Sequence, residues 1–156
     1  MTPEDRAAGI ARIRRFPDEL RQIAATLTDA QLTARPIPGE WSVAQNIHHC
    51  ADSHINSYVR LKLLLTEDRP PLKAYAEDRW GELPDATNAD LAATFQILDG
   101  LHQRWMDSFE VLDEDGWRRV GVHTKDGDLS AEDLLGIYVN HCNAHLEQIG
   151  RTVAAL

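Results

Sequence analysis

The chain has 156 residues, of which 43% are hydrophobic, and its formal net charge is −9. A chain of this length can bury a core without disulfide bonds, so we expect one domain over residues 1–156. The acidic balance argues against a nucleic-acid surface, which needs clustered Lys and Arg, and no apolar run is long enough to span a membrane. The expected partner is therefore a small molecule. The N-terminal residues lack the apolar core of a signal peptide, so we expect a cytoplasmic protein.

The first predicted helix begins where Thr2 can cap the backbone and Pro3 occupies the first helical position. Apolar residues at three- and four-residue spacing continue it to about Leu27. A kink is expected at Pro17, because proline cannot donate the regular helical hydrogen bond. Residues 28–41 are predicted to form a turn of helix followed by a loop.

The second predicted helix begins at Ser42, a capping residue, and runs to about Thr66. Between Trp41 and Val59 its only formally charged residue is Asp52. A helix that faces solvent normally carries a charged stripe, so we expect this helix to be covered on most sides. Residues 67–88 contain three prolines and mixed charge, and they are predicted to form a long ordered connection.

The third predicted helix begins near Asn88 and keeps heptad-like apolar spacing to Leu112. A minor β-hairpin is expected near residues 118–129, because Asp126-Gly127 is a dipeptide that supplies positive φ in tight hairpins.

The fourth predicted helix begins at a capping box made by Ser130 and Asp133, and it runs to about Val153. Four long antiparallel helices imply an all-α protein with a four-helix bundle fold.

Two histidines of the fourth helix, His141 and His145, lie four residues apart and are predicted to face inward. Imidazoles at this spacing can present two nitrogens to one metal ion, although two hydrogen-bonded core histidines explain the pair equally well. The second helix carries a buried polar stripe that needs partners. A third histidine from that stripe would complete a three-histidine site with open coordination positions. Helical periodicity alone mildly prefers His48 to His49 for this role.

Three stretches carry a family resemblance: PGEWSVAQNIHHCADSHINSYVRLKLLLTE, LHQRW and LGIYVNHCNAHLEQI. In this order and spacing they resemble the DinB superfamily and, within it, the YfiT subgroup of metal-dependent hydrolases. The resemblance covers the chain from about Leu32 onward. In that family the first metal histidine lies eight residues after the tryptophan of a W-[ST] motif, which corresponds here to Trp41 and His49. The other two form an HxxxH pair, which corresponds to His141 and His145, and the family fold is a four-helix bundle.

The resemblance also implies a chemistry. Family members bind nickel or zinc, and some related proteins use a low-molecular-weight thiol such as bacillithiol or mycothiol. It therefore implies a metal-dependent hydrolase or a thiol S-transferase, with one divalent metal ion that activates water or a thiol. The alternative is a non-catalytic bundle that binds a metal or a small ligand. A homodimer is the default expectation for a small bundle.

Other polar residues of the second helix are weighed as catalytic groups. Asp52 could accept a hydrogen bond from a ligand or act as a general base, and an ion pair with a neighbouring Arg explains it as well. Asn56 could orient the substrate, and simple hydrogen bonding between helices explains it equally well.

The remaining histidines and cysteines are expected to have structural roles. His102 is expected to be a core histidine, and His54 and His123 to lie at the surface or in loops. The two cysteines, Cys50 and Cys142, are expected to be buried, reduced thiols.

Overall fold

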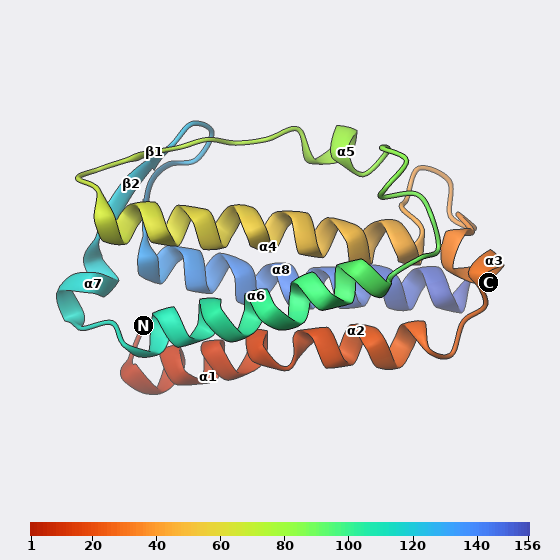
Figure 1. Ribbon diagram of the computed structural model, residues 1–156, viewed down its shortest axis with the longest axis horizontal. Coiled ribbons are helices and arrows are strands. Elements are labelled where there is room, and N and C mark those ends of the chain that lie inside the picture. The colour runs from red at the N-terminus through yellow and green to blue at the C-terminus, as the bar shows by residue number, and fades with distance from the viewer.

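In the computed structural model, which describes residues 1–156, four long helical segments pack into a bundle (Figure 1). The long segments are α1 (Pro3–Arg14) with α2 (Phe16–Ala24), α4 (Val43–Thr66), α6 (Ala92–Glu110) and α8 (Ala131–Ala154). The short elements are α3 (Asp29–Thr33), α5 (Glu77–Trp80), α7 (Glu114–Arg118), β1 (Pro71–Leu72), β2 (Val120–His123) and β3 (Gly127–Ser130). The predicted all-α four-helix bundle with a minor hairpin is confirmed.

The directions of the long helices differ from the predicted arrangement, in which neighbouring helices are antiparallel. Helix α4 packs against α6 and α8, and α1 packs against the same two helices. The chain runs one way through α1, α2 and α8 and the opposite way through α4 and α6 (Figure 1). The prediction of four antiparallel neighbours is therefore wrong for two of the pairs. Residues 67–91 cause this, because they return along the outside of α4 and are long enough to span its length of about 36 Å.

The first predicted helix is divided into α1 and α2 at Arg15. Pro17 lies in the first turn of α2, where a missing backbone N–H is tolerated. Its nitrogen cannot donate to the carbonyl of Ile13 four residues earlier, so the helical ladder is interrupted there. The kink expected at Pro17 is thus a break between two helices.

The starts of α4 and α8 are capping boxes. Ser42 Oγ accepts from the Gln45 backbone N–H at 3.1 Å, and Gln45 Oε1 accepts from the Ser42 N–H at 3.0 Å. Ser130 and Asp133 make the same reciprocal pair at 3.0 and 2.9 Å. Both predicted starts are confirmed, because side-chain oxygens there satisfy backbone donors that no helical carbonyl can reach.

Helix α6 begins later than predicted, at Ala92 instead of near Asn88. Asn88 Oδ1 accepts from the backbone N–H of Asp90 at 2.8 Å, and Asp90 Oδ1 accepts from that of Ala92 at 3.1 Å. These local bonds hold the backbone in turns that compete with helix formation.

The small sheet has the order β1-β2-β3. Strands β2 and β3 form the predicted hairpin, and His123 pairs with Gly127 across a loop of residues 124–126. Of the Asp126-Gly127 dipeptide, Gly127 has the expected positive φ, at 79°, and Asp126 does not. Strand β1 pairs in parallel with β2, and sequence analysis did not find it because two residues carry no periodicity.

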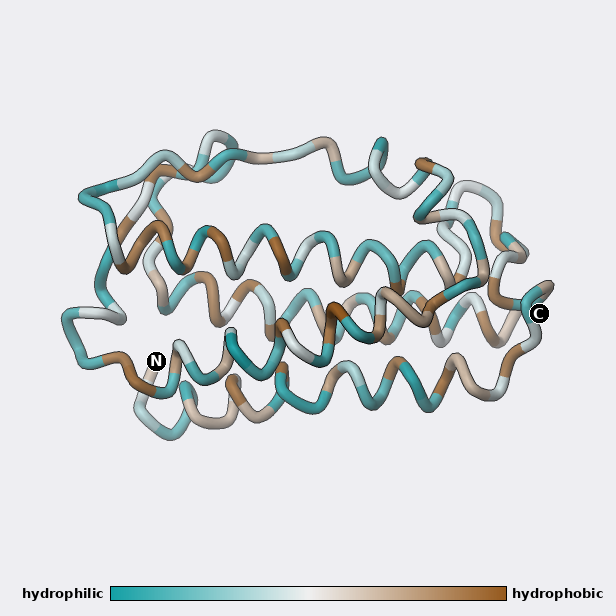
Figure 2. The backbone as a smooth tube through the Cα atoms, in the orientation of Figure 1, coloured by the Kyte–Doolittle hydropathy of each residue, from teal (hydrophilic) through white to brown (hydrophobic).

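Apolar stretches recur along each long helix between polar ones, as amphipathic helices require (Figure 2). Every residue from Ser42 to Ala51 is buried, which confirms that the first half of α4 is covered on most sides. No helix combines the length and the hydropathy that crossing a membrane requires. The largest fully buried core side chains include Trp105, Phe16, Phe109, Ile13, Leu20 and Ile47.

Candidate metal centre

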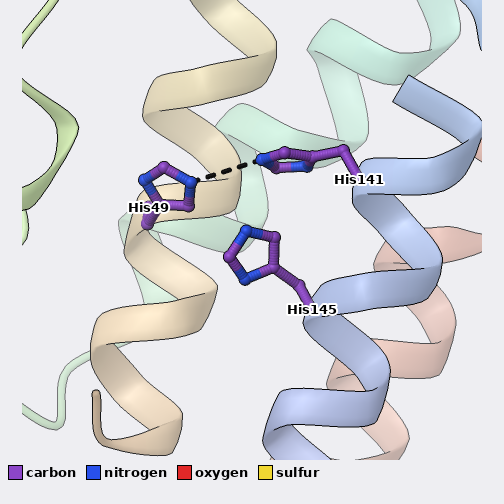
Figure 3. A group of neighbouring side chains, drawn as sticks. All are labelled: His49, His141 and His145. Carbon is purple, nitrogen blue, oxygen red and sulfur yellow. Dashed lines mark hydrogen bonds between the residues drawn. The ribbon is translucent and has the colours of Figure 1, made fainter. Parts of the chain in front are cut away.

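Three imidazoles meet in the space between α4 and α8 (Figure 3). One ring nitrogen from each of His49, His141 and His145 lies within 4.8 Å of the other two. The Nε2 atoms of His49 and His141 are 3.3 Å apart. Bonds of about 2.05 Å to a tetrahedral zinc ion place two ligand nitrogens about 3.4 Å apart. The donor set therefore fits one divalent cation after small side-chain shifts.

Histidines 48 and 49 have different surroundings. His48 Nδ1 lies 2.7 Å from Thr94 Oγ1, and its Nε2 lies 3.2 Å from the carbonyl oxygen of Asn88. Both of its ring nitrogens thus bond residues at or before the start of α6. His49 instead faces α8 (Figure 3). The structure therefore brings His49 to the HxxxH pair, as the family motif implied and as helical periodicity did not.

An asparagine that the sequence did not single out orients His145. Asn46 Oδ1 lies 2.8 Å from His145 Nδ1, and Asn46 Nδ2 donates to the carbonyl oxygen of Ser42 at 2.9 Å. Because the amide nitrogen is used by Ser42, the amide oxygen accepts from His145. The Nε2 atom of His145 is then free of hydrogen. Asn46 lies one helical turn before His49 in α4, and its polarity in a covered helix is the signal that could have revealed it.

Burial keeps the three imidazoles neutral. Loss of solvation lowers the pKa of His49 to about 3, with a further contribution from His145. Desolvation also lowers the pKa of His145 to about 4, and it holds the pKa of His141 well below its ordinary value. Neutral imidazole is the form that binds metals, so the site keeps its donor lone pairs at neutral pH.

Trp41 forms one wall of the centre. Its ring centroid lies 4.8 Å from that of His49, and the ring stacks on His145 at 6.5 Å with an interplanar angle of 12°. The connection packs against the indole, since a Cβ atom at Gly81 would lie only 2.7 Å from the ring. Gln45 Nε2 donates to the Gly81 carbonyl oxygen at 2.7 Å. The glycine therefore lets the connection approach Trp41 closely.

A pocket of about 340 Å³ opens onto the three histidines. Its charged lining consists of three carboxylates, on Glu40, Glu77 and Asp78, and no Lys or Arg lines it. The lining residues are Gly39, Glu40, Trp41, His49, Glu77, Asp78, His141, His145 and Gln148. The imidazoles are thus reachable from solvent through a polar opening.

The two residues expected to be catalytic, Asp52 and Asn56, do not line this pocket. Asn56 Nδ2 donates to the backbone carbonyl of Asp52 at 2.8 Å, a bond within α4. Desolvation, followed by the nearby charge of Asp85, raises the pKa of Asp52 to about 6. Of these polar residues of α4, His49 therefore lines the pocket, whereas Asp52 and Asn56 do not.

The remaining histidines are all buried. The surface or loop role expected for His54 is wrong, because its side chain is 0% exposed and lies inside the bundle. His102 is 2% exposed, which confirms the expected core histidine. The surface or loop role expected for His123 is wrong as well, since this residue is 6% exposed and lies in β2, with its Nδ1 2.7 Å from Asp126 Oδ2. The buried position of His54 could not be predicted, because no local sequence feature indicates its partners on the other helices.

Both cysteines, Cys50 and Cys142, are free and buried, as predicted. Each follows a histidine of the metal centre in sequence, so its side chain points in a different direction from that histidine.

Comparison with known proteins agrees with this geometry. Residues 12–149 match the model of the DinB superfamily. YfiT of Bacillus subtilis is 35% identical over 150 residues, which is 96% of this chain and 84% of YfiT. A solved structure of that protein, described as a probable metal-dependent hydrolase with an unusual four-helix bundle topology, superimposes with a TM-score of 0.92 over 97% of this chain and 87% of its own.

Two further proteins extend the comparison. OB0782 of Oceanobacillus iheyensis, also named as a metal-dependent hydrolase of the same kind, is 36% identical over 90% of this chain and 81% of its own. The mycothiol-dependent maleylpyruvate isomerase has a TM-score of 0.70 at 15% identity over 93% of this chain and 60% of its own, which shows a shared fold. Family match, sequence identity and bundle topology thus agree, and the chain belongs to the DinB superfamily.

Proposed function

We propose that this protein is a metal-dependent enzyme in which His49, His141 and His145 hold one divalent cation, zinc or nickel. The reaction we propose is attack by water or by a low-molecular-weight thiol on a small electrophilic substrate. The observation that carries this proposal is the convergence of three neutral imidazoles at a pocket open to solvent. Such a donor set leaves coordination positions free, as catalytic sites do and closed structural sites do not.

A bound divalent cation supplies Lewis-acid chemistry, because it lowers the pKa of a coordinated water or thiol. The protein's own residues would perform the other tasks. Asn46 holds the ring of His145 in its bonded orientation. Trp41 covers one side of the imidazoles and keeps water from that side.

The pocket carboxylates of Glu40, Glu77 and Asp78 are the groups available to take the proton that the nucleophile loses. Glu40 Oε2 lies 3.5 Å from an Arg151 nitrogen, so it already has an ionic partner. We therefore assign the proton-accepting role to Glu77 or Asp78, on α5, in preference to Asp52.

The names of similar proteins support the reaction class. YfiT is described as a probable metal-dependent hydrolase, which favours water as the nucleophile. The isomerase of similar fold depends on mycothiol, which favours a thiol. Both descriptions belong to those proteins, and they define the two arms of the activity test.

The metal site is tested by a matched pair of histidine variants. His141→Ala removes one of three donors, and we expect zinc affinity, measured by competition with a chelating indicator, to fall by more than about 100-fold. His48→Ala is the control, because His48 is a buried histidine of the same helix that bonds Thr94 and not the centre. Equal affinities in both variants, or no metal bound by the natural sequence, would contradict the proposal.

The catalytic step is tested with zinc- or nickel-loaded protein against a panel of esters, and against low-molecular-weight thiols with monobromobimane or an epoxide as the electrophile. Turnover in one arm identifies the nucleophile. A fully occupied metal site without turnover across the panel would instead favour the non-catalytic bundle. In that case the absorption spectrum of a cobalt-substituted sample should show no exchangeable water.

A further inference from the structure

A chain of hydrogen-bonded imidazoles leads from the metal centre into the core. His141 Nδ1 lies 3.2 Å from His54 Nε2, and His54 Nδ1 lies 2.7 Å from His102 Nε2. The last ring nitrogen, His102 Nδ1, lies 2.9 Å from the carbonyl oxygen of Ile13. Four helices contribute, since His141 lies in α8, His54 in α4, His102 in α6 and Ile13 at the end of α1.

The backbone carbonyl at the end of the chain sets its direction. A carbonyl oxygen only accepts, so His102 carries its proton on Nδ1 and its Nε2 must accept. His54 therefore donates from Nδ1 and accepts at Nε2. Because His54 Nε2 accepts, His141 must donate from its Nδ1–H. The Nε2 atom of His141 then carries no proton and keeps its lone pair.

This assignment holds when each imidazole carries a single proton. His54 is 0% exposed, and no carboxylate bonds either of its ring nitrogens. A second proton on His54 would place a positive charge in the core with no anionic partner beside it. Burial lowers the pKa of His102 to about 4. A chain of neutral rings admits only one order of donors once its last acceptor is a carbonyl.

The carbonyl of Ile13 is available because of Pro17. In a continuous helix the N–H four residues later would bond this oxygen, and proline has no N–H. The break between α1 and α2 therefore leaves the oxygen available to His102. Pro17 in the first helical segment therefore acts on His141 in α8, through the hydrogen bonds of His102 and His54.

We propose that His54 and His102 are positioning residues that lock His141 in the Nδ1–H tautomer, with its Nε2 lone pair facing His49 and His145. The consequence for cation binding rests on the proposed function, whereas the tautomer itself does not. His145 is locked in the same form through Asn46. His49 differs, because its Nε2 faces the bare Nε2 of His141 at 3.3 Å and must carry the proton there. His49 alone must move its proton to Nδ1 before its Nε2 can act as a donor.

Tautomers are measured directly in the metal-free natural sequence by long-range ¹H–¹⁵N correlation of the imidazole rings. We expect His54, His102, His141 and His145 to be Nδ1–H forms and His49 to be the Nε2–H form. Addition of zinc should convert His49 to the Nδ1–H form and leave the other four unchanged. A metal-free His141 with its proton on Nε2 would overturn the proposal, and this measurement needs no variant.

Two substitutions of His54 distinguish a role in fixing the His141 tautomer from a role in packing alone. His54→Leu removes the acceptor for His141 Nδ1–H, so the Nε2–H form of His141 should appear and zinc affinity should fall by about 10- to 100-fold. In His54→Gln the amide can accept from His141 and donate to His102. We expect this variant to keep the Nδ1–H form of His141 and to recover most of the affinity.

The outcomes distinguish this proposal from the proposed function. Zinc binding by the natural sequence with unchanged affinity in His54→Leu would overturn the lock and leave the metal site standing. Conversely, a natural sequence that binds no zinc but shows the expected tautomers would overturn the proposed function and support the lock. A His54→Gln variant as weak as His54→Leu would also count against the lock, because it would point to packing alone.

Discussion

Two clusters of imidazoles share helix α4. Beside the pocket, His49 meets the two histidines of α8, and in the core His54 meets His102 of α6. His54 and His102 are 0% and 2% exposed, and both nitrogens of each ring have partners. His49 is almost as buried, at 4%, yet only one of its ring nitrogens, Nε2, has a partner, the Nε2 of His141. Burial therefore does not distinguish the histidines of the candidate metal centre from those of the core. Ring nitrogens that converge beside an open pocket do.

The largest expected effect is a loss of stability at acidic pH, to which histidines of both clusters contribute. In the metal-free protein the folded-state pKa values of His49 and His102 are lowered to about 3 and about 4, whereas unfolding returns them to about 6.5. The unfolded state then binds more protons, so this stabilisation is complete above pH 6.5 and is lost as pH falls toward 4. Each such histidine contributes up to about 1.4 kcal/mol per pH unit.

Urea unfolding at several pH values between 7.5 and 5 measures this loss, which should reach several kcal/mol for the two clusters together. Saturating zinc should stabilise the folded state by binding the histidines beside the pocket. The pH dependence of stability that remains should then come from the core pair, His54 and His102. A free energy of unfolding that stays constant over this range would show that the rings are not held neutral.

A substitution at the pocket wall should affect only one cluster. Gly81→Ala places a Cβ atom 2.7 Å from the Trp41 ring, so the indole or the connection must shift. We expect the free energy of unfolding to fall by about 1–3 kcal/mol, and zinc affinity to fall as Trp41 moves against His49. Chemical denaturation and zinc titration measure the two effects.

Gly100→Ala is the matched control, since nothing lies within 4 Å of the added methyl group. In a helix interior this change should stabilise by about 0.5–1 kcal/mol without altering zinc binding. If Gly81→Ala kept full stability and full affinity, the wall role of Trp41 would be wrong.

The smallest expected effect is a loss of stability that spares the metal centre. Ser130→Ala removes the hydroxyl that accepts from the Asp133 N–H at 3.0 Å, which should cost about 1 kcal/mol. The cap lies about 16 Å along α8 from His141, so the frayed turn should not reach the ligands. Thermal unfolding measures the loss, and a parallel drop in zinc affinity would contradict this separation.

Most of the bundle could be predicted because its signals are local. The starts of α4 and α8 are set by side chains three residues apart that cap their own helices, at Ser42 and Ser130. Helical spacing likewise placed His141 and His145 on one side of α8. The parallel course of α4 and α6 could not be predicted, because the direction of a long connection depends on where it finds surface to cover.

The site was predicted in part. The family motif indicated His49, and the structure brings this residue to the pair on α8. Contacts across the bundle were beyond sequence analysis: Asn46 on His145, the connection on Trp41, and His54 between His102 and His141. Each joins residues far apart in the chain, and one sequence does not report which helix faces meet.

The sequence by itself determined the helices, their caps and the residue types able to bind a cation, because these follow from hydrogen bonds and spacing within a few residues. Which imidazoles are hydrogen-bonded on both nitrogens, and which keep one nitrogen free, depends on the tertiary structure. That difference depends on distances of about 3 Å between separate helices, which packing of the whole core sets.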